Sequence, residues 1–277
     1  MILTKRDIRL IEILADYGIF STDLIIKRVF NSIDYSSVLK RLRILEKNNF
    51  IRRAGLLENK ENVWAVTNKA SNYHASTHFK SYWTHANLNH DLKLVKLRLL
   101  FEEIDIAKKW IPEHVIRSMI YQKYSLREAK KKLIPDGILE CKINKKIESF
   151  AIELELNLKS QKRYQQIISL YQWKNDLHGI LYIVPSHRIL KKLQEIWNKF
   201  AVRNNELKIF FLVLSELENL REHAYIYSND RPILMKEMFP EVSHSLAHWV
   251  GSEVVLKKAM LIDSNSQFQS SFSDYQT

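Results

Sequence analysis

The chain has 277 residues, enough for two modest domains, and its 46% hydrophobic and 27% charged residues are typical of a soluble globular protein. The single cysteine, Cys141, excludes an internal disulfide and a cysteine-based zinc cluster, and the longest apolar run, residues 209–214, is too short to cross a bilayer. A formal charge of +12 and a pI near 9.5 make nucleic acid the first partner to consider and an anionic membrane the second.

The positive charge is concentrated near the start of the chain. Residues 1–80 hold 14 Lys and Arg against 8 Asp and Glu. The first nine residues carry charges instead of the apolar core of a signal peptide, and no strongly amphipathic basic helix is evident. We therefore expect a cytoplasmic protein that binds no membrane.

Three short helices are predicted at the start of the chain. Thr4 with Asp7 is typical of a helix start, because the hydroxyl accepts from an early backbone N–H, and Gly18 is typical of a helix end. Apolar spacing predicts a second helix over about residues 22–29 and a third over about 34–47.

The third helix carries a basic stripe on the face opposite its apolar residues. Two strands follow, around residues 50–53 and 63–67, joined by a polar turn over 55–62, so residues 1–70 resemble a winged helix-turn-helix. The residues expected to contact DNA are Tyr35, Ser36, Lys40, Arg41, Arg43, Lys47, Arg52 and Arg53. Two alternatives remain open: the stripe is a solvated helix face, or the segment is a protein-interaction module.

Residues 71–87 read as a polar linker, and its histidines, His74, His78 and His85, are assigned to surface or hinge roles. A strongly apolar helix is predicted over residues 88–106. His90 aligns with the inward face of this helix, where a lone histidine is more often a hydrogen-bonded core residue than a ligand. Asp91 and Glu102 are weaker candidates for an additional acid.

Three extended segments are predicted to form a meander, over about residues 111–119, 133–143 and 147–156. The second begins after Pro135-Asp136, and the third contains Glu153 and Glu155, which project from one face of a strand. These acids are either a solvated strand face or an oxygen cage for Mg²⁺ or Mn²⁺, with Asp136, Glu153 and Glu155 as ligands.

Cations flank these acids in the sequence. Lys130, Lys131 and Lys132 precede them, and this run is either a solvated loop or, beside a metal site, a grip for a phosphate backbone. Lys159, Lys162 and Arg163 follow at the start of a predicted helix. Alternating apolar runs and helices then predict central strands covered on both faces. The last segments, 221–262 and 263–277, are expected to be an extension and a disordered tail.

The order of elements around Pro135-Asp136-Gly137 and Glu153-Leu154-Glu155 resembles the core of the PD-(D/E)XK nuclease superfamily. With the helix-turn-helix start, Asn89-His90-Asp91 and the Arg163-Tyr164 to Tyr171 helix, it is similar to the replication-relaxation proteins and the MobC-type relaxases of mobilisable plasmids. The resemblance covers roughly residues 1–220. It implies an α/β (α+β) fold in which a winged helix-turn-helix precedes a restriction-endonuclease-like domain, residues 88–220, with a central mixed sheet flanked by helices.

One position departs from the superfamily pattern, because Glu155 stands where a lysine is usual. Either Glu155 is a third metal ligand and Lys159 or Lys162 supplies the positive charge, or the site does not cut. The predicted function is metal-dependent nicking or cleavage of double-stranded DNA at a plasmid or mobile-element origin, with other mobilisation proteins as further partners. The alternative is a catalytically inactive DNA-binding regulator or accessory protein. The catalytic candidates are Asp136, Glu153, Glu155, Lys159, Lys162 and His90.

Overall fold

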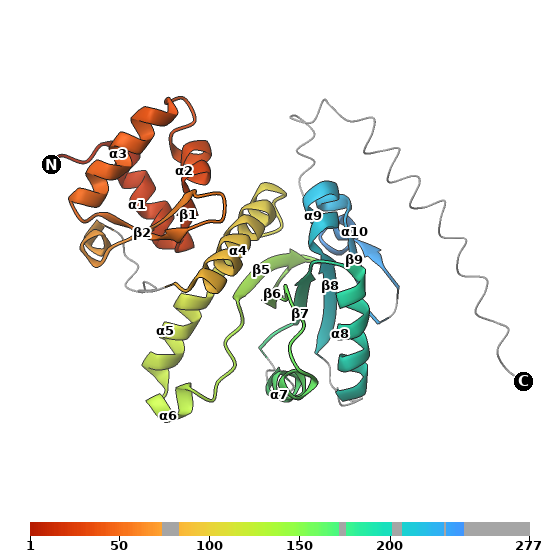
Figure 1. Ribbon diagram of the computed structural model, residues 1–277. Coiled ribbons are helices and arrows are strands. Elements are labelled where there is room, and N and C mark those ends of the chain that lie inside the picture. Colours follow the sequence, from red (N-terminus) through yellow and green to blue (C-terminus); the bar gives the residue numbers. More distant parts are fainter. Residues whose placement is uncertain (74–82, 172–175, 201–206, 230, 241–277) are drawn as a thin grey trace, which may run out of the picture.

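The computed structural model describes residues 1–73, 83–171, 176–200, 207–229 and 231–240 (Figure 1). His74, His78, residues 241–262 of the expected extension and the expected tail, 263–277, lie outside the described residues. Among the described helices, none combines the length and the apolar character that a membrane crossing requires.

The first part of the chain is a body of three helices and a three-stranded antiparallel sheet in the order β1-β3-β2. Thr4 caps the first helix, where its hydroxyl accepts from the N–H of Asp7, and Gly18 ends it with a φ of 92°. These ends confirm the predicted helix bounds. The elements are α1 (Lys5–Tyr17), β1 (Phe20–Ser21), α2 (Thr22–Val29), α3 (Tyr35–Lys47), β2 (Ile51–Leu56) and β3 (Asn62–Val66).

Helix α4 (His85–Glu103) follows a short 3-10 helix, η1 (Asn68–Tyr73), and lies between the N-terminal body and the large sheet (Figure 1). One side of α4, including Leu92 and Leu99, is buried against the N-terminal body. Another side, including Leu97 and Phe101, is buried against the sheet. The helix is therefore part of two hydrophobic cores, which explains why its sequence is apolar on nearly all faces.

The large sheet has seven strands in the order β10-β9-β8-β7-β6-β5-β4. Strands β6, β7 and β8 are parallel to one another, and the remaining neighbours are antiparallel. The sheet is thus mixed, as predicted. The strands are β4 (Lys109–Pro112), β5 (Gly137–Ile143), β6 (Lys146–Leu154), β7 (Gly179–Val184), β8 (Lys208–Val213), β9 (Tyr225–Tyr227) and β10 (Ile233–Leu234).

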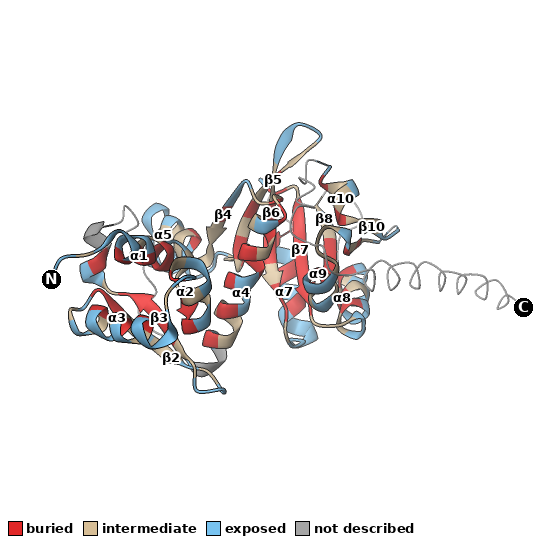
Figure 2. Ribbon diagram, turned by 90° about the horizontal axis from the view of Figure 1, so that it is seen from above, coloured by how far each residue is buried: buried red, intermediate tan, exposed pale blue. Residues whose placement is uncertain are grey.

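Helices cover both faces of this sheet, so strands β6 to β8 are largely buried (Figure 2). The face that carries Ile152 and Leu154 packs against α4, α9 (Leu214–Leu220) and α10 (Met235–Met238). The short 3-10 helix η2 (Arg221–His223) contacts both α9 and α10. The opposite face, which carries Ala151 and Tyr182, packs against α7 (Gln161–Tyr171) and α8 (His187–Phe200). The prediction of central strands covered on both faces is confirmed.

Three parts of the large-sheet region differ from the prediction. The expected strand over 111–119 is short, because Pro112 lacks an N–H and is followed by helix α5 (Glu113–Lys123). The expected loop before β5 contains a further helical turn, α6 (Leu126–Ala129), capped by Ser125. Two segments of the expected C-terminal extension, Tyr225–Tyr227 and Ile233–Leu234, supply β9 and β10 to the same sheet.

Candidate functional site

The register of β5 and β6 brings two of the predicted acids together. Gly137 pairs with Ile152 in this antiparallel pair, so extending the register by one residue places Asp136 opposite Glu153. The main-chain N–H of Leu154 donates to Asp136 Oδ2 at 2.8 Å, which fixes the aspartate at the end of β6.

Gly137 is required next to Asp136 on steric grounds. A Cβ atom at this position would lie 2.8 Å from Cζ2 of the Trp110 ring. The indole of Trp110, on the edge strand β4, therefore packs directly on the backbone of β5, and the glycine after Pro135-Asp136 has a packing role.

His90 lies beside Asp136, on the side of α4 that faces the sheet. Its Nε2 is 3.1 Å from the carbonyl oxygen of Leu154 and 3.4 Å from Asp136 Oδ2, and its Nδ1 is 3.5 Å from Asp91 Oδ1. Burial lowers the pKa of His90, but hydrogen bonds to the two aspartates and the charge of Asp136 raise it to about 10. His90 is therefore a cation between two carboxylates at neutral pH.

Glu153 points toward α7, where the hydroxyl of Tyr171 donates to its Oε1 at 2.5 Å. Burial raises the pKa of Glu153 well above its usual range, and the nearby charges of Asp136 and Glu155 raise it further. The hydrogen bond from Tyr171 and the positive charge of Lys159 lower the pKa of Glu153, but by less. The three predicted acids therefore interact electrostatically.

Glu155 lies just beyond the end of β6, although the sequence analysis placed it inside the strand. Its N–H donates to the carbonyl of Ile183 on β7 at 2.9 Å, and its residue exposure is only 4%. The ammonium group of Lys159 forms an ion pair with Glu155 Oε2. The N–H of Lys159 also donates to the hydroxyl of Tyr164, at 3.0 Å, which holds this lysine against α7.

These groups line one open pocket of about 1010 Å³, which we call the acidic pocket. Its lining includes Asp136, Glu153, Glu155, Lys159 and His90, so five of the six predicted catalytic residues meet there. Lys162 is the sixth, and it lines a neighbouring hollow with Lys130, Lys131 and Lys132.

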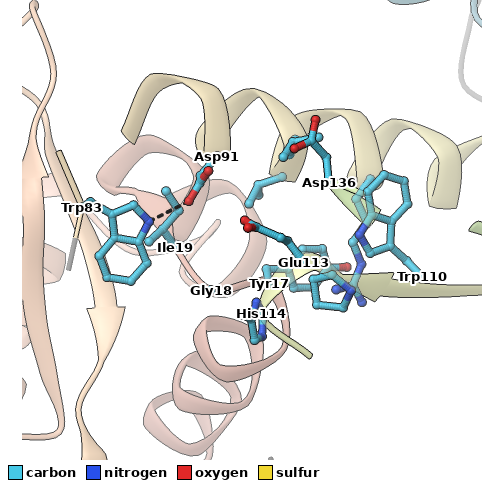
Figure 3. A pocket seen from close by; sticks show the side chains of 13 residues that line it. Tyr17, Gly18, Ile19, Trp83, Asp91, Trp110, Glu113, His114 and Asp136 are labelled. Carbon is cyan, nitrogen blue, oxygen red and sulfur yellow. Dashed lines mark hydrogen bonds between the residues drawn. The ribbon is translucent and has the colours of Figure 1, made fainter. Parts of the chain in front are cut away.

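A smaller cavity, of about 50 Å³, adjoins the acidic pocket between α4, β4 and the end of α1 (Figure 3). Asp91, Glu113 and His114 line both spaces, and the indole of Trp83 donates to Asp91 Oδ2 at 2.8 Å. Tyr17 and Gly18 also line this cavity, so the surroundings of Asp136 extend to the N-terminal body.

The chemistry of the donor set suits a hard divalent cation held by few protein ligands. Mg²⁺ commonly binds one or two carboxylates and completes its shell with water and substrate phosphate. Asp136 and Glu153 lie opposite each other and could supply two such carboxylates. However, no group of three His, Cys, Asp or Glu side chains in the described part of the chain is arranged to hold a metal. The predicted three-carboxylate cage is therefore not preformed, and Glu155 is engaged by Lys159.

The predicted DNA-contacting residues divide into two groups. Tyr35, with 60% exposure, and Ser36, Lys40, Arg43 and Lys47 are exposed on α3. Across the described residues, the side chains of Lys40, Arg43 and Lys47 form no ion pair.

The other three predicted DNA contacts have partners within the protein. The guanidinium of Arg41 is paired with the buried Asp7. That of Arg53 lies 3.2 Å from Glu46, and that of Arg52 lies over the ring of Trp83 at 5.0 Å. These arginines help to hold the body together.

The sequence analysis missed several residues of the pocket. Glu113, His114 and Arg117 were not considered because α5 was expected to be extended. The predicted packing of Tyr164 and Tyr171 against the sheet is confirmed, but their hydroxyl contacts to Lys159 and Glu153 had no sequence signal.

Comparisons of the chain with protein-family models, curated proteins and solved structures found no match.

Proposed function

We propose that this protein is a DNA-binding, metal-dependent endonuclease or nickase. The observation that carries the proposal is that Asp136 and Glu153 line one open pocket and interact electrostatically, with the ion pair of Glu155 and Lys159 in the same lining. Paired carboxylates and a nearby cation are the groups that phosphodiester hydrolysis requires. The order of β5, β6, α7 and β7 along the chain supports the proposal of a PD-(D/E)XK-like core.

In this proposal, Asp136 and Glu153 hold Mg²⁺ or Mn²⁺, which when bound supplies Lewis-acid activation of the phosphate. The Leu154 N–H and His90 fix the orientation of Asp136, and Tyr171 fixes that of Glu153. Lys159 offsets the negative charge that develops on the phosphate in the transition state, while Glu155 positions its ammonium group.

The proposed role of residues 1–70 is to locate the duplex as a winged helix-turn-helix. The order of three helices with a β1-β3-β2 sheet supports this assignment, as does the exposed basic stripe on α3. Helix α3 would enter the major groove and contact phosphates and base edges. The family resemblance suggests that the DNA site is a plasmid or mobile-element origin.

A cleavage assay on supercoiled plasmid tests the proposal. Wild-type protein with Mn²⁺ or Mg²⁺ is expected to convert an origin-containing plasmid to nicked or linear form. Asp136→Asn and Glu153→Gln are each expected to lower the rate at least about 100-fold, since each removes a charged metal ligand. Glu140→Gln is a matched control because Glu140 lies on β5 but pairs with Lys109 away from the pocket. Equal cleavage by wild type and by both pocket variants would contradict the proposal.

A second candidate is a DNA-binding regulator or accessory protein with an inactive nuclease-like core. Two observations favour it: Glu155 stands at the usual lysine position, and the described residues contain no preformed three-ligand metal site. Saturable duplex binding with no cleavage by wild type in any divalent metal would select this candidate over the nuclease.

A further inference from the structure

A second hollow, of about 900 Å³, continues from the acidic pocket along α7. The two spaces share five lining residues: Arg117, Tyr121, Leu133, Ile134 and Arg163. Helices α5 and α6 with the connection into β5 form one wall of this second hollow, and α7 forms the other (Figure 1). We call it the basic trough.

Six cations line the basic trough, and no acidic side chain does. They are Arg117, Lys130, Lys131, Lys132, Lys162 and Arg163. In the described structure, the ammonium groups of Lys130, Lys131, Lys132 and Lys162 have no carboxylate partner within ion-pair distance. Arg117 is paired with Glu113, and the charge of Lys132 also acts on Glu128. The positive charges gathered around one hollow still repel one another, so their placement favours an anionic ligand.

The position of Lys162 and Arg163 gives an independent reason for an anion. Both lie in the first turn of α7, where the helix dipole disfavours cations, and this turn contains no acid. The N–H groups of Arg163 and Tyr164 already donate to Ser160, so a phosphate at the same place would be stabilised by the two cations and by the helix dipole.

The trough also offers uncharged and aromatic groups. Gln165, Gln166 and Ser169 line the α7 wall, and Tyr121 is exposed on α5. Cations that follow a backbone, combined with exposed aromatic rings, are typical of single-stranded nucleic acid sites.

We infer that the basic trough binds one single strand of nucleic acid and leads it to the acidic pocket. A single strand fits better than a duplex because the acids are recessed between two walls and Glu155 is only 4% exposed. Enzymes whose target lies out of reach in a duplex act on a strand that has left it. This inference rests on the proposed nuclease function and adds that duplex and single strand are bound by different surfaces, α3 and the trough.

Binding of fluorescent single-stranded and duplex oligonucleotides of the same sequence, measured by anisotropy with EDTA present, tests the inference. Lys131→Glu with Lys132→Glu is expected to weaken single-strand binding at least about 10-fold. The slope of the logarithm of the association constant K against the logarithm of the salt concentration should decrease in magnitude by about 0.7 per lost phosphate contact. Duplex affinity is expected to change by less than about 2-fold, because the duplex is bound by α3. The charge-matched control is Lys191→Glu with Lys192→Glu, on the exposed side of α8, which should leave both affinities equal to wild type.

Equal losses for single strand and duplex, or no loss for either, would overturn the inference. The same variant is also tested for binding to vesicles that contain phosphatidylserine. If it loses binding to these vesicles but binds single strands as wild type does, the cations serve a membrane surface and the inference is overturned. The assay contains no metal and follows no cleavage, so its outcome is separate from that of the plasmid assay.

Discussion

Asp7 and Arg41 show how a long-range partner decides the role of a single residue. Asp7 is completely buried on α1, and Arg41 from α3 binds its carboxylate with two guanidinium nitrogens. Burial alone would raise the pKa of Asp7, but the hydrogen bonds from Arg41 and Thr4 lower it below its usual value. The pair thus links the first and third helices of the N-terminal body.

Replacing Asp7 with Asn should destabilise the protein by about 2 kcal/mol at pH 7, because Arg41 loses a charged acceptor. Since the folded protein lowers the pKa of Asp7, the stabilisation is complete above its ordinary pKa and is lost as the pH falls through the folded value. Urea unfolding of wild type and variant should therefore show a free-energy difference that shrinks below about pH 4.

The control for this measurement is Asp23→Asn, which removes a solvent-exposed pair with Lys27 and should cost less than about 0.5 kcal/mol. If the difference in the free energy of unfolding between wild type and Asp7→Asn stays constant as the pH falls below about 4, this account of the pair is contradicted.

At the scale of elements, α3 is the predicted duplex-binding surface. Lys40→Ala with Arg43→Ala removes two exposed cations that form no ion pair in the described structure and leaves the buried residues Val38 and Leu42 in place. Duplex affinity should fall about 10-fold at low salt, and the slope of log K against log salt should decrease by about 2. Titration of labelled duplex at several salt concentrations measures both quantities.

Lys191→Ala with Lys192→Ala provides a control of equal charge on α8. If the α3 variant binds duplex as wild type does, with the same salt dependence, residues 1–70 serve as a protein-interaction module instead.

Most helices and strands were predicted from the sequence, because they depend on local signals. So was the gathering of Asp136, Glu153 and Glu155 at one pocket. Capping by Thr4, the stop at Gly18 and the alternation around Glu153 are short-range patterns. The strand assigned to residues 111–119 was wrong because Val115, Ile116 and Met119 fit an extended run as well as the helical spacing of α5.

The remaining details depend on contacts distant in the sequence. The sequence analysis assigned Arg41 to DNA because it lies beside the basic stripe of α3. Its actual partner, Asp7, is 34 residues away in the chain and gives no local signal. Tyr171 lies 18 residues from Glu153, and nothing in its helical spacing indicates a hydroxyl bond. The sequence analysis named Lys159 and Lys162 as alternative cations for the acids. Lys159 is the one paired with Glu155, because β6 ends at Leu154 and the chain turns there.

At the scale of the whole molecule, α4 joins the N-terminal body to the sheet. Arg98 of α4 contacts Asp16 at 2.5 Å and Glu102 at 2.8 Å, and its guanidinium lies over the ring of Tyr17 at 3.8 Å. Glu103 forms ion pairs with Arg28 of α2 and Arg221 beyond α9. These contacts, together with the shared apolar helix, fix the N-terminal body relative to the acidic pocket.

This arrangement predicts one cooperative unfolding transition. Leu92→Ala affects the core of the N-terminal body and Leu97→Ala affects the sheet core, and each should cost about 2–5 kcal/mol. Calorimetry should show a single peak for wild type, shifted to lower temperature as a whole by either substitution. Two peaks, only one of which moves with Leu92→Ala, would mean that the two parts unfold independently.

The central claim is that Asp136 and Glu153 share a divalent cation. Anomalous diffraction from crystals grown with Mn²⁺ tests it most directly. The account predicts a peak about 2.1 Å from oxygens of both carboxylates, which disappears in Asp136→Asn crystals. The absence of a peak at saturating Mn²⁺, or one bound only by residues outside this pocket, would contradict it.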